Sequence, residues 1–327
     1  MNFRTKAVFI LLALTLVSGG AYPMVRWAVT RVDPFALTGF AFLFGTAAFF
    51  PLCFRAPPKL PKSFRGAPPG PRFWLWTGLA AGALISCASL LQSHGMIWTT
   101  SGKSAFISSL YVVLVPLMAF ATGRRPGPGV WAGLVFGVSG FYFISLAEDG
   151  GGGFNRGDAL TLAAAACLAS HLLLVGRCAN RVDPVRFTTT KTAVAAASCL
   201  TVASARGALP GWDAFIETLP VTLFGVVSIS CSHSVQTFCQ RHVRASEAAM
   251  ILQLKAVFAA LFGMAFLNED MTPSMWAGAA LVVFGSIIAQ SNAERSALSE
   301  ADPCAPELLR RAGPTKVQAA AFRSPGP

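Results

Sequence analysis

Long apolar runs, each close to twenty residues, recur along this chain and constrain its fold more than any other feature. A helix of about twenty residues spans roughly 30 Å, the thickness of the hydrocarbon core of a bilayer. Because lipid offers a backbone no hydrogen-bond partner, such runs predict an all-α integral membrane protein. We predict ten transmembrane helices, at residues 6–27, 34–54, 73–92, 103–122, 129–147, 158–177, 187–205, 217–238, 245–267 and 273–290.

The composition agrees with a membrane protein and excludes a nucleic-acid binder. Hydrophobic residues make up 54% of the chain and charged residues only 12%, whereas soluble domains carry about 25% charged residues. The formal net charge is +12, but Lys and Arg stand in short segments between the apolar runs, so no nucleic-acid partner is expected. The eight cysteines form no CxxC pair and no Cys/His cluster at zinc spacing, so we expect neither a metal nor another cofactor.

The segments between the apolar runs can be assigned alternately to the two sides of a membrane. The basic and the acidic residues then fall mostly on opposite sides. One side receives most of the Lys and Arg, and the other receives most of the acids, among them Asp158 and Glu269. By the positive-inside rule, the cation-rich side, which includes both termini, faces the cytoplasm. The acidic side holds five cations, which are Arg26, Arg31, Lys103, Arg156 and Arg206.

The two ends of the chain carry separate expectations. Residues 18–21, Ser-Gly-Gly-Ala, could form a signal-peptide cleavage site, but the apolar run continues to Trp27, so we expect this helix to be retained. The segment 291–327 is rich in Ala, Pro, Ser and Arg and has no sustained apolar period. We expect it to be a disordered cytoplasmic tail.

The chain contains an internal repeat. The tetrapeptide Arg-Val-Asp-Pro occurs at residues 31–34 and again at 181–184. The tripeptide Trp-Ala-Gly occurs at 131–133 and again at 276–278. Matches at similar offsets indicate two copies of one unit. Between them, Gln92 corresponds to Gln236, Ser104-Ala105 corresponds to Ala248-Ala249, and Gly140 corresponds to Gly285.

Each copy holds five predicted spans, in residues 5–147 and 158–290. An odd number of spans places the two copies in opposite orientations across the bilayer, so the fold is two inverted five-helix repeats. Inverted repeats are common in secondary transporters, which bind substrate near the midplane between the repeats. The phosphate loop GxxxxGK[ST] is absent from the sequence, so nothing argues for ATP hydrolysis.

Two segments carry a resemblance to a known family. Residues 99–117, which include Ser-Ser-Leu-Tyr-Val-Val-Leu-Val-Pro-Leu, resemble the first half of an EamA-type member of the drug/metabolite transporter superfamily. Gln-Arg-His-Val at 240–243 and Phe-Ala-Ala-Leu-Phe-Gly at 258–263, ending at Glu269, resemble its second half. The resemblance covers roughly residues 5–290. It implies ten spans, an inverted repeat, and export or exchange of small metabolites across a bacterial inner membrane.

The chain departs from that family in its ninth span. Where the family usually carries Glu-Pro, this chain has Lys255-Ala256, while the first repeat keeps Pro116. The exchange reverses a charge and removes a helix kink. A role inferred from the family's Glu therefore does not carry over to this position.

Polar side chains within the spans are the candidate substrate-binding groups. Ser101, Ser104, Ser108 and Tyr111 recur at helical spacing along one face of the fourth span. In lipid this stripe either lines a cavity or holds neighbouring helices together through its hydroxyls. The remaining polar candidates are Gln92, His233, Gln236 and Gln253.

Lys255 carries the sharpest hypothesis, because it lies deep in the ninth span and no Asp or Glu falls clearly in the middle of any span. A charge at the centre of a helix costs about 2.5–3.5 kcal/mol on insertion scales. A cavity holding this lysine attracts an anionic or zwitterionic metabolite and repels a cationic drug. The competing interpretation has Lys255 reach toward an interface or pair with a helix C-terminus.

These features predict a secondary transporter for a small anionic or zwitterionic metabolite, such as an amino acid or organic acid, working by alternating access, with export the favoured direction. The alternatives are a multidrug exporter of the same superfamily, a channel, or a membrane-embedded enzyme. We expect no enzymatic activity, because the four histidines share no ligand spacing. The expected partners are the substrate and the lipid bilayer, and a homodimer is left open.

Overall fold

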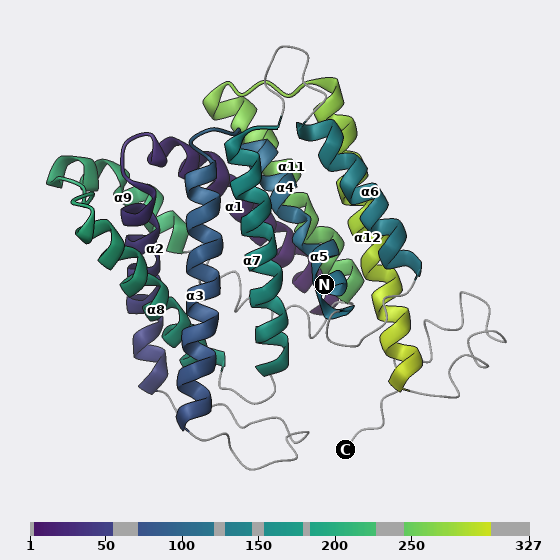
Figure 1. Ribbon diagram of the computed structural model, residues 1–327, viewed down its shortest axis with the longest axis horizontal. Helices are drawn as coiled ribbons and strands as arrows, with labels where there is room; N and C mark the ends of the chain where they lie inside the picture. Colours follow the sequence, from purple (N-terminus) through teal and green to yellow (C-terminus); the bar gives the residue numbers. More distant parts are fainter. Residues whose placement is uncertain are drawn as a thin grey trace.

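The computed structural model describes residues 3–54, 71–120, 128–145, 154–178, 184–226 and 245–301, and this part of the chain is helical with no strand (Figure 1). The first half contains α1 (Phe3–Val29), α2 (Pro34–Phe49), the 3-10 helix η1 (Phe50–Phe54), α3 (Pro71–Gly95), α4 (Ser101–Ser109), α5 (Tyr111–Phe120) and α6 (Pro128–Ser145). The second half contains α7 (Arg156–Cys178), α8 (Pro184–Ala205), α9 (Trp212–Val226), α11 (Ala245–Leu267) and α12 (Pro273–Ala301).

The prediction of an all-helical fold is confirmed. Each predicted span overlaps a described helix, although the eighth, at 217–238, is described only as far as Val226. Helix α12 continues to Ala301, beyond Ser291 where we placed the start of the tail, and residues 302–327 lie outside the described part. Within the described ranges, the segments that could cross a membrane by length and composition are Phe9–Val29, Leu75–Gly95 and Arg156–Val175, and the other apolar helical stretches there are shorter.

The fourth span was expected to be one helix, but it is divided at Leu110. The Leu110 N–H donates to the Ile107 carbonyl at 3.1 Å, and the Val113 N–H donates to the Leu110 carbonyl at 2.9 Å. Each of these bonds joins a residue to the third residue before it, as in a 3-10 helix, instead of to the fourth. The helix is therefore tighter where α4 ends and α5 begins. All nine residues of α4 are buried, which makes α4 the central helix of the bundle.

Glycines bring α6 and α12 into backbone contact. A Cβ atom on Gly140 would lie 2.5 Å from the Gly278 carbonyl oxygen, and one on Gly278 would lie 2.6 Å from the Gly140 oxygen. Gly133 and Gly285 approach each other in the same reciprocal way. The two helices are therefore antiparallel and lie side by side (Figure 1). The repeat relates Gly133 to Gly278 and Gly140 to Gly285, so the two contacts are exchanged by a pseudo-two-fold axis.

Other helix contacts follow the same symmetry. Helices α2 and α8, which are counterparts in the two repeats, pack against each other, and Thr46 of α2 bonds Thr192 of α8 at 3.0 Å. The contact of α1 with α11 is matched by the contact of α7 with α4 and α5. The described helices thus have the two-repeat architecture that the sequence predicts.

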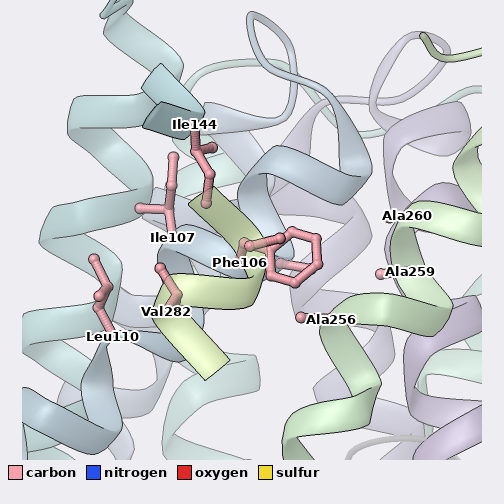
Figure 2. Close-up of a cluster of buried hydrophobic side chains, with 10 residues drawn as sticks. Phe106, Ile107, Leu110, Ile144, Ala256, Ala259, Ala260 and Val282 are labelled. Atoms are coloured by element: carbon pink, nitrogen blue, oxygen red, sulfur yellow. The ribbon is translucent and has the colours of Figure 1, made fainter. Parts of the chain in front are cut away.

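The hydrophobic core between the repeats joins α4 to α11, α6 and α12. Phe106 of α4 points toward α11, where Ala256, Ala259 and Ala260 lie (Figure 2). Ile107 and Leu110 lie on the side of Val282 (Figure 2). Small residues on α11 facing larger ones on α4 let the two helices pack closely.

We expect Gly140→Ser and Gly278→Ser to destabilise the protein to a similar degree, by about 1–3 kcal/mol, because either side chain must push two backbones apart. Gly211→Ser is the matched control, since a Cβ there meets nothing within 4 Å. Thermal unfolding in detergent measures the difference. Equal melting temperatures for Gly140→Ser and Gly211→Ser would contradict the close crossing of α6 and α12.

Candidate functional site

Lys255 stands between two tyrosine rings at the interface of the repeats. Its Nζ lies 5.7 Å from the centroid of the Tyr22 ring on α1 and 6.0 Å from that of Tyr111 at the start of α5. The lysine lies near the middle of α11 and remains partly accessible. Ring contacts at these distances favour a cation by about 0.5–2 kcal/mol each. Among the described residues no carboxylate forms an ion pair with Lys255.

The position of Tyr22 follows from a glycine one turn before it. A Cβ on Gly19 would lie 2.6 Å from the Cβ of Phe258 and 2.9 Å from the carbonyl oxygen of Lys255. Only a glycine permits this approach of α1 to α11. Tyr22, three residues later on the same helix face, is thereby brought to the Lys255 side chain.

Tyr111 and Lys255 lie on corresponding spans of the two repeats, the fourth and the ninth. Corresponding spans of two inverted repeats meet at the pseudo-two-fold axis, so this contact places Lys255 close to it. The division between α4 and α5 occurs one residue before Tyr111. Interrupted helices near the midplane are typical of substrate sites in transporters.

The polar stripe of α4 is matched by partners on other helices. Gln92 Nε2 of α3 donates to Ser108 Oγ at 2.6 Å. The hydroxyls of Ser104 and Thr161 of α7 lie 3.4 Å apart. The structure thus brings Gln92 and Ser108 together and places the Ser104 side chain against α7. Both serines are buried, and their bonds join neighbouring helices as the second interpretation of the stripe requires.

One end of the bundle gathers charged side chains from both repeats; we call it the charged end, defined by Arg26, Lys103, Asp158 and Glu269. Glu269 accepts hydrogen bonds from the Ser101 N–H, at 2.8 Å to Oε1 and 3.0 Å to Oε2, and from Ser101 Oγ at 2.6 Å. Arg26 Nε lies 2.9 Å from Oε1 of the same carboxylate. Glu269 thereby satisfies first-turn amides of α4 and interacts favourably with its dipole.

A second buried ion pair at the charged end joins α4 to α7. Lys103 Nζ lies 3.0 Å from Asp158 Oδ2, and the two side chains are only 3% and 0% exposed. Asp158 also accepts from Thr99 Oγ1 at 2.8 Å. Its own backbone N–H donates to Asn155 Oδ1 at 2.9 Å, which caps α7. Asp158 is therefore held by three neighbours in addition to its position in α7.

Three predicted site residues are not described at the level of their side chains. His233 and Gln236 lie outside the described residues, and the Gln253 side chain within α11 is also outside them. Sequence reasoning missed Tyr22, because we counted it only as part of an apolar run. It also missed the pairing of Arg26 with Glu269, although both were assigned to the same side of the membrane.

The family model described as the EamA-like transporter family matches residues 5–146 and 155–290, once on each repeat. The chain belongs to this family. Its members are membrane transporters, and nothing in this match points to catalysis. The resemblance drawn from residues 99–117 and 240–269 is thus confirmed.

One relative and one solved structure extend the comparison of this EamA-like transporter. It is 29% identical over 290 residues to a protein of Archaeoglobus fulgidus described as an uncharacterized transporter, covering 84% of this chain and 82% of that one. A solved structure, titled only as the crystal structure of a protein, aligns with a TM-score of 0.56 at 18% identity. The alignment covers 87% of this chain and 98% of that chain, and at this identity it shows the fold alone.

We expect Lys103→Met to destabilise the transporter by about 3–5 kcal/mol, because it leaves the Asp158 carboxylate buried without its cation. The double variant Lys103→Met/Asp158→Asn should recover much of this loss. Denaturant unfolding in detergent measures both. Arg31→Met is the control, since its pair with Glu217 is 37% and 51% exposed and is worth under about 1 kcal/mol. Similar losses for Lys103→Met and Arg31→Met would contradict the buried pairing.

Proposed function

We propose that this EamA-like transporter is a secondary carrier that exports a small anionic or zwitterionic metabolite by alternating access. In this proposal it crosses a bacterial inner membrane ten times, with both termini in the cytoplasm. The charged end then faces outward. Gln92, Ser104, Ser108, Tyr111 and Lys255 contribute to the substrate site or its walls.

The observation that carries the proposal is the cation at Lys255, which no carboxylate among the described residues balances. An ammonium within a span costs about 2.5–3.5 kcal/mol, and the rings of Tyr22 and Tyr111 offset only part of that cost. A carboxylate or phosphate on the substrate would supply the missing counter-charge. Lys103 differs in this respect, because it already pairs with Asp158. Lys191 of α8 has no carboxylate partner among the described residues either, but α8 packs against α2 and α3, whereas Lys255 lies between α1 and α5, which belong to the first repeat.

The pairing of charges supports the proposed orientation. Three of the five cations assigned to the outer side have an acidic partner at the same end: Arg26 with Glu269, Arg31 with Glu217, and Lys103 with Asp158. Arg206 stacks over the Phe35 ring at 5.0 Å. Locally neutralised cations weigh little against the excess of Lys and Arg on the other side.

The symmetry of the bundle supports alternating access. The repeat maps the Gly133–Gly285 contact between α6 and α12 onto the Gly140–Gly278 contact. Each repeat can therefore take up the conformation of the other, as inverted-repeat carriers require. The lysine disfavours a cationic drug as cargo, because like charges repel in a site removed from water.

The experiment begins with metabolite profiling of cells with and without the protein, followed by transport of the changed metabolite in reconstituted vesicles. We expect Lys255→Ala to weaken transport roughly 10- to 150-fold, the loss of one charge-assisted contact, while Lys255→Arg retains much of it. Lys316→Ala, in the C-terminal tail, is the matched control. Unchanged transport by Lys255→Ala would show that Lys255 does not bind the substrate, and would contradict an anionic group on the cargo as its counter-charge.

Transport measured in inside-out and in right-side-out vesicles distinguishes export from import. An exporter should accumulate the metabolite inside inside-out vesicles and not in right-side-out vesicles under the same gradient. Conductance that rises linearly with concentration, without saturation, would indicate a channel instead.

A further inference from the structure

Among the described residues, the ionic contacts of Glu269 and Asp158 at the charged end run from one repeat to the other. Glu269 belongs to the second repeat, and its partners Arg26 and Ser101 belong to the first. Lys103 of the first repeat pairs with Asp158 of the second. Any movement that separates the repeats at this end must break these contacts.

Arg26 and Glu269 together tie three chain segments. Arg26 Nη1 donates to the Met96 carbonyl at 2.8 Å, in the connection between α3 and α4. Glu269 follows α11, and its side chain is only 6% exposed. The Gly102 N–H also points to Oε2 of Glu269 at 3.4 Å. The carboxylate is therefore removed from water and surrounded by donors from the start of α4 and the end of α1, a geometry in which charge-assisted hydrogen bonds are strong.

Helices α4 and α11 also pack closely at the charged end. A Cβ on Gly263 would collide with the Glu269 carboxylate and with Ser101 Oγ. A Cβ on Gly102 would lie 3.0 Å from Ala260. The end of α11 thus lies directly against the start of α4, and the Glu269 carboxylate closes the small gap that the glycines leave.

The sequence supplies no such contacts at the counterpart positions. With the offset that relates Trp131 to Trp276, Glu269 corresponds to Arg124. With the offset that relates Arg31 to Arg181, Arg26 corresponds to Gly176. An arginine and a glycine cannot reproduce the ion pair.

The other ion pair lacks a counterpart as well. With the offset of 144 residues between Gln92 and Gln236, Lys103 corresponds to Glu247. With the offset that relates Arg31 to Arg181, Asp158 corresponds to Val8. The symmetry of the fold is therefore broken in its charges.

We propose that Arg26, Glu269 and the first turn of α4, with the Lys103–Asp158 pair beside them, form a one-sided latch that keeps the transport pathway closed at the charged end. In a fully symmetric inverted repeat the two exchanged conformations have similar energies. The latch stabilises only one of them, so the carrier at rest opens at the opposite end. The inference rests on the proposed function for its orientation: with the charged end outside, the resting carrier accepts cytoplasmic substrate, as an exporter must.

The test is hydrogen–deuterium exchange of the full-length protein in lipid nanodiscs, which needs no substrate. Glu269→Gln keeps the shape of the side chain and removes its charge. We expect at least roughly tenfold faster exchange at residues 101–104, since the charge-assisted bonds to the Ser101 and Gly102 amides are lost and the first turn of α4 opens with them. We also expect slower exchange at the opposite end, at the starts of α3 and α8 (residues 71–76 and 184–190), because the population shifts toward the conformation closed there.

Glu217→Gln is the matched control, since it breaks an exposed ion pair at the same end and should change neither region. If Glu269→Gln accelerates exchange at 101–104 without any change at 71–76 and 184–190, Glu269 only caps α4 and the latch is wrong. Unchanged exchange at 101–104 would also overturn it. Because the readout involves no cargo, a failure of Lys255 to bind an anion leaves this result unaffected, and the two failures can be distinguished.

Discussion

The burial of α4 is the constraint on which the rest of the structure depends. All nine of its residues are removed from water, so its first-turn amides and its hydroxyls must find partners within the protein. Glu269 supplies acceptors for the amides, Thr161 faces Ser104, and Gln92 bonds Ser108. Glu269 and Thr161 belong to the second repeat, so contacts that satisfy α4 also fix the two repeats against each other.

Lys255 lies between the two repeats, and none of its partners among the described residues carries a negative charge. Lys103 reaches Asp158, whereas Lys255 faces the rings of Tyr22 and Tyr111. Its contact with Tyr111, on the corresponding span of the other repeat, places it near the pseudo-two-fold axis that relates the two repeats. A group near this axis moves least when the repeats exchange arrangements, so it can stay with a substrate throughout the transport cycle.

The helices and the two repeats could be predicted from the sequence, because apolar length and the recurrence of Arg-Val-Asp-Pro at 31–34 and 181–184 are properties of the chain itself. The division at Leu110 could not, since it comes from local hydrogen bonds inside a stretch whose sequence predicts one span. The partners of the α4 stripe were equally inaccessible, because they depend on which helices cross. Tyr22 was overlooked for the same reason: only the close approach at Gly19 brings it to α11.

The structure of the transporter in complex with its cargo, determined in lipid nanodiscs, is the measurement that tests the central claim most directly. The account predicts a carboxylate or phosphate of the bound metabolite within hydrogen-bond distance of Lys255 Nζ, with the rings of Tyr22 and Tyr111 on either side. A metabolite bound elsewhere in the bundle, with Lys255 still surrounded only by the two rings, would contradict it.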